Sequence, residues 1–202
     1  MNPNLKAFTL VELLLAIVLT MILTALLMPA MSRTHCGGRR SNCLSNARQI
    51  GLAFKQYSVD NSDSFPSVSS NSSLTSSSVF LSLTNGNYLS VGRIYLCPQD
   101  EKRTCGTSSC FTSSNNSYAC LVADSTGTKG LTEGESSDNP LILDRGLIGA
   151  PGYAINLTNA TWSQTSPHKT YGGNIFYVGG HASFRRFFDT GSDGTNGFVV
   201  VP

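Results

Sequence analysis

Residues 8–31 read FTLVELLLAIVLTMILTALLMPAM and contain a single ionisable side chain, that of Glu12. An apolar run of this length is enough to span a bilayer as a helix of about 20 residues. A carboxylate inside such a run costs about 2.5 kcal/mol or more, so it is read by default as functional. A secretory signal peptide fits less well, because its apolar core is shorter and a small-residue cleavage site should follow it. The run therefore predicts an N-terminal membrane helix that carries a functional acid.

The residues around this acid, KAFTLVELL at positions 6–14, resemble the processing site of type IV pilins and type II secretion pseudopilins. In that family a short basic leader is cut before a Phe, the new amine is methylated, and a Glu stands fifth in the mature chain. The resemblance implies that residues 1–7 are a leader, that a prepilin peptidase/methyltransferase cuts between Ala7 and Phe8 and methylates Phe8, and that Glu12 serves assembly. The residue before the cut, usually Gly, is Ala7 in this chain. Pro29 matches the position at which many helices of this family kink.

The same resemblance implies a structural filament subunit of a type II secretion pseudopilus or a type IV pilus-like fibre. Its partners would be other copies of itself or other pilin-like subunits, together with an assembly platform in the inner membrane. We expect a single-pass protein of the bacterial inner membrane whose head lies outside the cytoplasm. The alternative is a membrane-tethered or filament-tip binding module, such as a minor pilin or an adhesin.

Elementary electrostatics gives Glu12 a role in this assembly. Cleavage would expose an α-amine at Phe8, at the edge of the apolar run. An unpaired buried charge costs several kcal/mol, whereas a well-placed partner of opposite charge recovers much of that cost. We therefore expect Glu12 of one subunit to meet the Phe8 ammonium of a neighbour and to set the register between subunits.

Composition bounds the rest of the chain. The protein has 202 residues, 13% of them charged, and a formal net charge of +2. Beyond the apolar run about 170 residues are left, which suits a single domain. The small net charge gives no reason to expect a nucleic-acid partner. Because there is no second apolar run of spanning length, we expect one membrane pass.

The pattern after the apolar run predicts a second, amphipathic part of the helix at residues 32–60 and a globular head at residues 61–202. Two glycines at residues 37–38 each weaken a helix by about 1 kcal/mol, so this pair is a candidate break. From residue 41 onward apolar residues recur at spacings of three and four, which indicates a helix with one buried face. The stripe consists of Leu44, Ala47, Ile50, Phe54 and Tyr57.

The C-terminal third carries the clearest sheet signal. Residues 174–187 read as a strand, a Gly-Gly turn and a second strand, which predicts a hairpin. Short runs at residues 117–123 and 141–144 also suit strands. Residues 43–66 and the segment from His168 to Val178-Gly179 resemble a group of pseudopilin-like proteins with a His-x9-Asp-Gly signature. The predicted fold class is α+β, with a long N-terminal transmembrane and amphipathic helix packed on a small antiparallel sheet, as in pilins.

Six cysteines stand in a chain whose head is expected outside the cytoplasm, which predicts disulfides. They are Cys36, Cys43, Cys97, Cys105, Cys110 and Cys120. Zinc is the alternative, but no Cys-x2-Cys pair occurs. Six cysteines allow 15 connectivities, which the sequence leaves open.

Among these connectivities we favour a Cys43–Cys97 bridge. Residues 93–98 read as an extended segment that closes at Cys-Pro, and the helix carrying Cys43 must lie on the sheet. This bridge would close a loop of about 55 residues. Cys105 and Cys110 are close enough for a local loop, which leaves Cys36 with Cys120 by elimination.

Signs of a cofactor or of catalysis are weak. Residues 189–197, DTGSDGTNG, loosely resemble the calcium loop of the major pseudopilin, so Asp189 and Asp193 are candidate calcium ligands. Calcium prefers six to eight oxygens, and a plain turn is the alternative. His168 and His181 are candidate metal ligands, although isolated histidines usually lie at the surface or in satisfied contacts. Without a GxSxG, HExxH or phosphate-binding motif, we expect no enzyme and no other cofactor.

Overall fold

The computed structural model describes residues 8–66, 75–103, 115–124, 131–147, 154–155, 160–187 and 197–200. The side chains of residues 27–36, 122–124, 154–155 and 197–200 are outside this description. The chain divides into two units, Met1–Gly38 and Arg39–Pro202, and each is considered by itself. The predicted leader, residues 1–7, lies outside the described residues.

One helix, α1 (Leu10–Asp60), runs through both units. It continues through Pro29 and through Gly37 and Gly38, so the break expected at residues 37–38 is wrong. Each glycine costs about 1 kcal/mol. Ending the helix there would require a second helix nucleus, which is the costly step of helix formation. The helix therefore absorbs the two glycines.

In the second unit, α1 buries the stripe that the sequence predicts. Ala47, Ile50 and Phe54 are completely buried, whereas Leu44 and Tyr57 at the edges of the stripe are half-buried. Gly51 lies against the sheet, where an added Cβ would come within 2.2 Å of the ring of Phe176. The missing side chain thus lets the helix approach the sheet closely.

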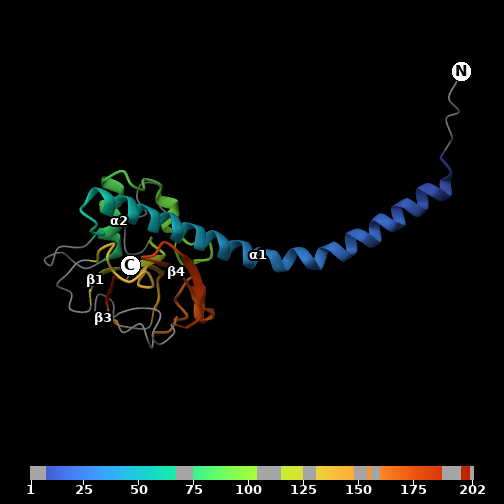
Figure 1. Cartoon of the computed structure of the whole chain (residues 1–202). Coiled ribbons are helices and arrows are strands. Elements are labelled where there is room, and N and C mark those ends of the chain that lie inside the picture. The colour runs from blue at the N-terminus through green and yellow to red at the C-terminus, as the bar shows by residue number, and fades with distance from the viewer. Residues whose placement is uncertain are drawn as a thin grey trace, which may run out of the picture. The chain divides into compact units, whose positions relative to one another are not determined.

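The sheet has six strands, and every neighbouring pair in it is antiparallel. The strands are β1 (Tyr118–Asp124), β2 (Pro140–Asp144), β3 (Ala154–Ile155), β4 (Gly173–Tyr177), β5 (Ala182–Arg185) and β6 (Gly197–Val200). Their order is β3-β6-β1-β2-β4-β5. The second part of α1 is residues 39–60, which belong to the second unit. Figure 1 shows this part of α1 and helix α2 (Ser76–Asn85) on one side of the sheet. This arrangement confirms the predicted α+β class and is consistent with a pilin-like fold.

Strands β4 and β5 form the predicted hairpin, with a loop of three residues instead of two. The backbone N–H of Gly180 donates to the carbonyl of Tyr177 at 2.9 Å, and the N–H of Tyr177 donates to the carbonyl of His181 at 3.0 Å. Gly180 has a φ of 85°, the left-handed conformation that closes a three-residue hairpin. Val178 and Gly179 complete the loop.

Two short 3-10 helices complete the description, η1 (Gly92–Tyr95) and η3 (Lys169–Tyr171). Residues 93–98 read as an extended segment in the sequence. Their first residues belong instead to η1, and Leu96, which follows η1, has an extended backbone. Helix α2 begins three residues before the apolar run of residues 79–81. Thr75 caps this helix by accepting a hydrogen bond from the N–H of Ser78.

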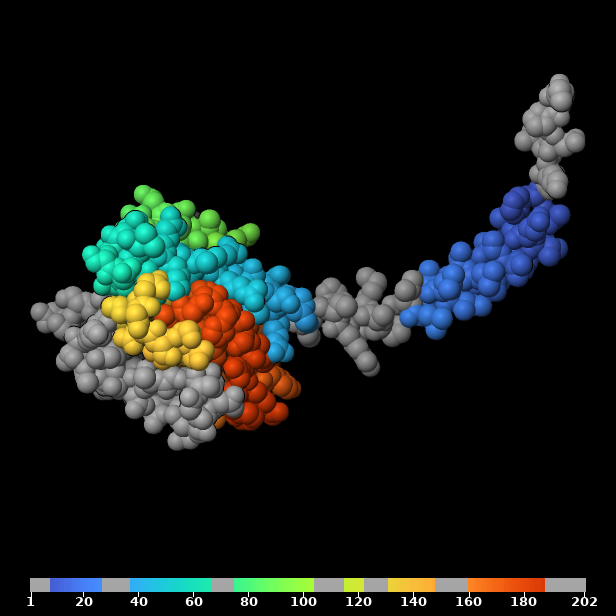
Figure 2. All heavy atoms as spheres, viewed as in Figure 1, coloured from blue at the N-terminus to red at the C-terminus, as the bar shows by residue number. Residues whose placement is uncertain are grey.

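Residues 131–147 hold the C-terminal end of α1 against the sheet. Figure 2 shows this segment and residues 160–187 directly beside the second part of α1. Glu133 pairs with Lys55 and also accepts a hydrogen bond from the hydroxyl of Ser58 at 2.7 Å. Both partners belong to α1, so an ion pair and a hydrogen bond supplement the apolar contacts at this end of the helix.

Candidate functional site

The chain carries two candidate sites. The first is the assembly segment, residues 8–26, in the first unit. Thr9 precedes α1 and accepts a hydrogen bond from the backbone N–H of Glu12 at 3.2 Å. In return, Glu12 Oε2 accepts from the N–H of Thr9 at 3.0 Å and from its hydroxyl at 2.8 Å. This reciprocal arrangement is a capping box, which satisfies the free N–H groups at a helix start.

Every described side chain of the assembly segment is exposed. Thr20 and Thr24 donate their hydroxyls back to carbonyls of their own helix, at 2.9 Å to Ile17 and 3.0 Å to Thr20. The remaining side chains are almost all apolar. Contiguous apolar surface of this extent normally marks a site of protein or membrane contact.

Among the helices in the described part of the chain, none combines the length and the apolar character that crossing a membrane requires.

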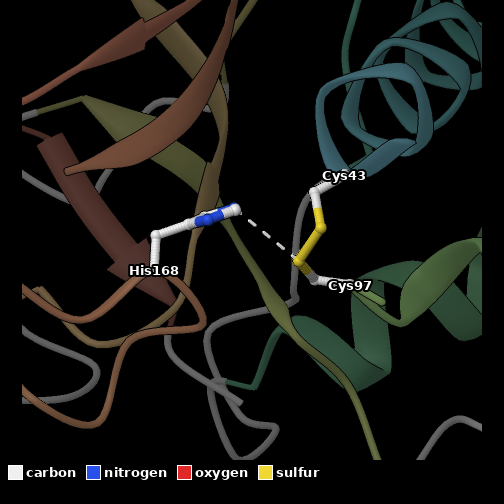
Figure 3. A group of neighbouring side chains, drawn as sticks. All are labelled: Cys43, Cys97 and His168. Atoms are coloured by element: carbon white, nitrogen blue, oxygen red, sulfur yellow. Dashed lines mark hydrogen bonds between the residues drawn. A yellow bond between two sulfur atoms is a disulfide. The ribbon is translucent and has the colours of Figure 1, made fainter. Parts of the chain in front are cut away.

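The second candidate site is the helix–sheet junction, formed by Cys43, Cys97, Asp144, His168 and Asn174. A disulfide joins Cys43 of α1 to Cys97, which follows η1, and this is the pair that the sequence favours. Figure 3 shows the ring of His168 directed at the Cys97 sulfur from the segment before η3. The distance from Cys97 Sγ to His168 Nε2 is 3.7 Å. All three side chains are buried.

Behind His168 lies the carboxyl group of Asp144, at the end of β2. Its Oδ2 accepts hydrogen bonds from the backbone N–H and the side-chain amide of Asn174, at 2.7 and 3.0 Å. The same amide lies 2.9 Å from His168 Nε2, and Asp144 Oδ2 lies 3.4 Å from that nitrogen. Asp144 Oδ1 has no hydrogen-bond partner among the residues that the structure describes. One carboxyl oxygen of this buried group is thus held, and the other is not.

Burial sets the charge state of this pair. It raises the pKa of Asp144 to about 7, although the hydrogen bonds from Asn174 act in the opposite direction. Burial, assisted by the positive charge of Arg40, lowers the pKa of His168 to about 4. The imidazole is therefore neutral at pH 7, and its contact with Asp144 is not an ion pair with a charged histidine.

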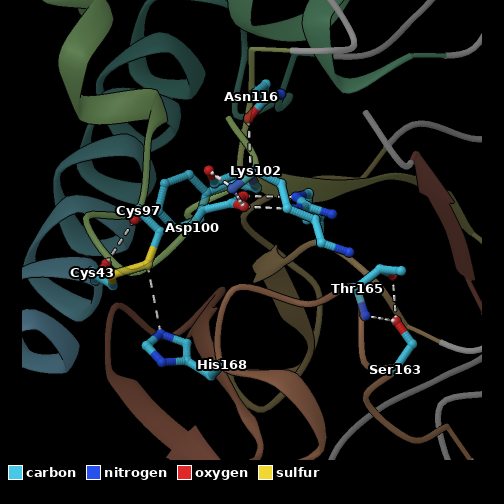
Figure 4. A network of polar contacts seen from close by, with 11 residues as sticks. Cys43, Cys97, Asp100, Lys102, Asn116, Ser163, Thr165 and His168 are labelled. Atoms are coloured by element: carbon cyan, nitrogen blue, oxygen red, sulfur yellow. Dashed lines mark hydrogen bonds and ion pairs between the residues drawn. A yellow bond between two sulfur atoms is a disulfide. The ribbon is translucent and has the colours of Figure 1, made fainter. Parts of the chain in front are cut away.

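A second buried carboxyl group, that of Asp100, is ionised at pH 7, in contrast to that of Asp144, whose pKa is raised. Arg145 donates to both of its oxygens, at 2.6 and 2.8 Å, and the hydroxyl of Ser117 adds a third hydrogen bond at 2.8 Å. Burial acts to raise the pKa of Asp100, but these hydrogen bonds bring it below its ordinary value. Figure 4 shows Asp100 beside the disulfide and His168.

A groove of about 690 Å³ runs along α1 next to the disulfide. Its walls are mainly polar side chains of α1 and of the chain around Cys97, including Asn42, Asn46, Arg93 and Arg103. Asn46 donates to the carbonyl of Leu96 at 2.9 Å and so joins the two walls. Cys97 itself lines the groove, which gives small solutes a route to the junction.

The structure corrects one predicted disulfide. Cys120 is a free, completely buried thiol in the central strand β1, so the expected Cys36–Cys120 bridge is wrong. Burial raises the pKa of this thiol well above its ordinary value. The side chain of Cys36, and the whole of Cys105 and Cys110, lie outside the described residues.

The predicted metal ligands have different outcomes. Asp189 and Asp193, the candidate calcium ligands, lie outside the described residues. His181 is exposed and stacks on Tyr177, with ring centroids 4.2 Å apart. His168 is buried in the satisfied contacts described above, so the two histidines belong to different environments.

Two features of these sites were missed by the predictions from the sequence. The capping box could have been predicted, because the pattern Thr-x-x-Glu before an apolar run is its usual signal, and it gives Glu12 a role inside its own chain. The junction has no such signal, because Asp144, His168 and Asn174 are brought to Cys97 only by the order of strands in the sheet.

Replacing Asp144 with asparagine is expected to reveal a pH dependence that the pair normally cancels. Unfolding moves the pKa of Asp144 from about 7 to 3.8 and that of His168 from about 4 to 6.5. Between about pH 4 and 6.5 the carboxyl then releases one proton as the imidazole takes one up, so the net effect on stability is small. In Asp144→Asn only His168 remains, whose contribution is complete above pH 6.5 and is lost as the pH falls toward 4.

Urea unfolding of the oxidised protein at several pH values would measure this. The free energy of unfolding of Asp144→Asn should rise between pH 4 and 6.5 by roughly 1 kcal/mol per pH unit relative to the unmodified protein. Asp138→Asn, at an exposed carboxyl, is the control and should leave the profile unchanged. Parallel profiles for Asp144→Asn and the unmodified protein would contradict the opposite pKa shifts of Asp144 and His168.

Comparison with known proteins gives one match. A family model described as the prokaryotic N-terminal methylation motif matches residues 3–28. No curated protein and no solved structure matches the chain. The match covers the junction between the predicted leader and the assembly segment, including Ala7, Phe8, Thr9 and Glu12.

Proposed function

We propose that this chain, which its N-terminal methylation motif identifies as a type IV pilin-like or pseudopilin precursor, is a structural subunit of a bacterial filament. The motif implies processing by a prepilin peptidase and assembly with other pilin-like subunits. The filament would be a type II secretion pseudopilus or a type IV pilus-like fibre. The role is structural and not enzymatic.

The observation that carries this proposal is the exposure of the whole assembly segment. Residues 8–26 bury no described side chain, although they are almost entirely apolar. Burial of a Leu, Ile or Val side chain is worth about 1.5–3 kcal/mol, so this helix gains a large free energy when it is covered. Other copies of the same helix would cover it in a filament core.

Before assembly the covering medium would be the lipid bilayer. The apolar run of residues 8–31 is long enough for one pass as a helix. The capping box supports insertion, because Glu12 already accepts two hydrogen bonds from Thr9 and so enters the membrane partly satisfied. We propose a single-pass protein of the inner membrane, with residues 39–202 outside the cytoplasm.

On the mature side of the expected cut, Phe8 is accessible. Phe8 is 79% exposed and lies outside the helix, which begins at Leu10. Exposed, non-helical backbone is the usual substrate of a peptidase. Cutting between Ala7 and Phe8 would leave the capping box intact, because both of its members are in the mature chain.

Filaments sheared from cells that express the chain would test the proposal. Electron microscopy should show fibres, and mass spectrometry should identify this chain as a subunit. The matched control is a strain without the prepilin peptidase, in which the fibres should be missing while the precursor accumulates in the membrane. Equal fibre numbers in the two strains would contradict assembly after processing.

A filament-tip binding module is the second candidate, and the polar groove beside Cys97 favours it. The groove is lined by Asn42, Asn46 and Arg93, side chains with several hydrogen-bond donors. The stoichiometry of the chain in sheared fibres separates the two functions. A major subunit would account for most of the fibre mass, whereas a tip module would be present in very few copies per fibre.

A further inference from the structure

We propose that the helix–sheet junction is a zinc site when Cys43 and Cys97 are in the dithiol form, with His168 as the third protein ligand. The ligand atoms of Cys43, Cys97 and His168 all lie within 4.8 Å of one another, and all three residues are buried. They come from three separate segments, namely α1, the turn after η1 and the segment before η3 (Figure 3). The fold alone brings them together.

The spacing of these atoms suits tetrahedral zinc. Zinc lies about 2.3 Å from thiolate sulfur and about 2.0 Å from imidazole nitrogen, which puts neighbouring sulfur and nitrogen ligands about 3.6 Å apart. Cys97 Sγ and His168 Nε2 are already 3.7 Å apart. After reduction the two sulfurs must separate to about 3.8 Å, which rotation of the two side chains can provide. Two thiolates and one imidazole favour zinc over calcium or magnesium.

Asp144 and Asn174 lie next to the proposed ligands. Asp144 Oδ2 lies 3.4 Å from His168 Nε2 and accepts hydrogen bonds from the backbone and side-chain N–H groups of Asn174, at 2.7 and 3.0 Å. A carboxylate this close to the nitrogen ligand favours a cation beside it, because opposite charges attract. The amide of Asn174 would give up its contact with His168 Nε2.

The metal also has an entry route. Cys97 is only 2% exposed, but it lines the groove of about 690 Å³ beside α1. A hydrated cation can reach the sulfur from this groove without opening the core on the sheet side. Once bound, the metal would join α1 to the turn after η1, as the disulfide now does, and also to the segment before η3 through His168.

A dithiol reductant would convert the disulfide into the metal-binding form. Two electrons and two protons pass from the reductant to the Cys43–Cys97 disulfide, which becomes two thiols while the reductant forms its own disulfide. Zinc binding then releases the two thiol protons to solvent. A disulfide oxidant reverses the process, because it removes two electrons from the thiolates, re-forms the Cys43–Cys97 bond and expels the metal. The disulfide and the zinc ion thus use the same two sulfurs, so only one of these two cross-links can be present at a time.

Cobalt is a suitable probe, because its thiolate complexes absorb visible and near-ultraviolet light. The experiment uses the full chain in detergent with Cys36, Cys105 and Cys110 replaced by serine. After reduction with a dithiol and its removal, cobalt should bind one ion per chain with a thiolate charge-transfer band, and zinc should displace it. Zinc should raise the Tm of the reduced protein and leave that of the oxidised protein unchanged.

Variants assign the ligands. Cys97→Ser should abolish the charge-transfer band, and His168→Gln should weaken zinc binding by about tenfold or more. Cys120→Ser is the matched control, since that buried thiol lies outside the cluster, and its binding should be unchanged. Circular dichroism of each reduced variant without metal shows whether it is folded. If the reduced parent chain is unfolded, zinc should restore its spectrum but should not restore that of a Cys43→Ser/Cys97→Ser chain.

Three results would overturn the proposal. The first is no cobalt band in the reduced protein. The second is an equal band in Cys97→Ser, and the third is equal binding by the oxidised protein.

Discussion

Replacing Glu12 with glutamine is expected to abolish filament assembly while leaving the protein in the membrane. Glutamine keeps the capping box, because its side-chain carbonyl can accept the hydrogen bonds that Thr9 donates to Glu12. It removes only the negative charge. If that charge pairs with the Phe8 ammonium of a neighbouring subunit, the ammonium is left buried and unpaired, at a cost of several kcal/mol for each subunit. Fibre counts in sheared fractions, normalised to the membrane-bound protein, measure the effect.

Two further variants separate charge from capping. Glu12→Val removes both and should also block assembly, although it makes the apolar segment cheaper to insert by about 2.5 kcal/mol. Thr9→Ala removes the hydroxyl of the cap, keeps the charge and should still form fibres, at a cost to the helix start of about 1 kcal/mol. Fibres of normal number from Glu12→Gln, combined with none from Thr9→Ala, would show that Glu12 acts through the cap and not through its charge.

Loss of the Cys43–Cys97 disulfide is expected to cause the largest change in stability. The two cysteines are 54 residues apart, and the chain-entropy estimate for a loop of this size is about 4 kcal/mol. Because the bond fixes α1 to the segment that follows η1, its loss should loosen the helix in the second unit first. In a chain with Cys36, Cys105 and Cys110 replaced by serine, Cys97→Ser should lower the free energy of unfolding in urea by roughly this amount.

A dithiol reductant provides the internal control for this prediction, in the presence of a chelator that removes metal ions. The reductant should destabilise the parent chain by about as much as the substitution does, and it should not change Cys97→Ser further. Cys120→Ala, at the free thiol of β1, should keep its sensitivity to the reductant. A parent chain that unfolds at the same urea concentration with and without reductant would show that this bond contributes little.

The main elements of the fold could be predicted because they depend on local pattern. The apolar stripe Ala47, Ile50 and Phe54 has the helical period, and the structure buries all three. The β4–β5 hairpin follows from its pair of glycines, of which Gly180 takes the left-handed conformation. The break at residues 37–38 was wrong because local propensity ignores the cost of starting a new helix.

The two candidate sites also differ in whether local sequence pattern predicts them. Ala7, Phe8 and Glu12 lie within one short stretch of the sequence, so their motif is readable, and the methylation-motif match covers all three. The junction depends on contacts between distant segments. His168 meets Asp144 only because β2 and β4 are neighbours in the sheet, and no spacing in the sequence reports this. The disulfide partner of Cys120 could not be found by elimination, because Cys120 is a free thiol. It is buried in β1, which lies between β6 and β2, and this position depends on the order of strands in the sheet.

The intact mass of the protein purified from membranes or fibres tests the central claim most directly. We expect a chain that lacks residues 1–7, begins at Phe8 and carries one extra methyl group on its N-terminal amine. Ala7→Gly, which restores the residue usual at this position in the family, is the matched control and should give the same mature mass. A protein that keeps residues 1–7 in cells that cut the Ala7→Gly variant would contradict the account.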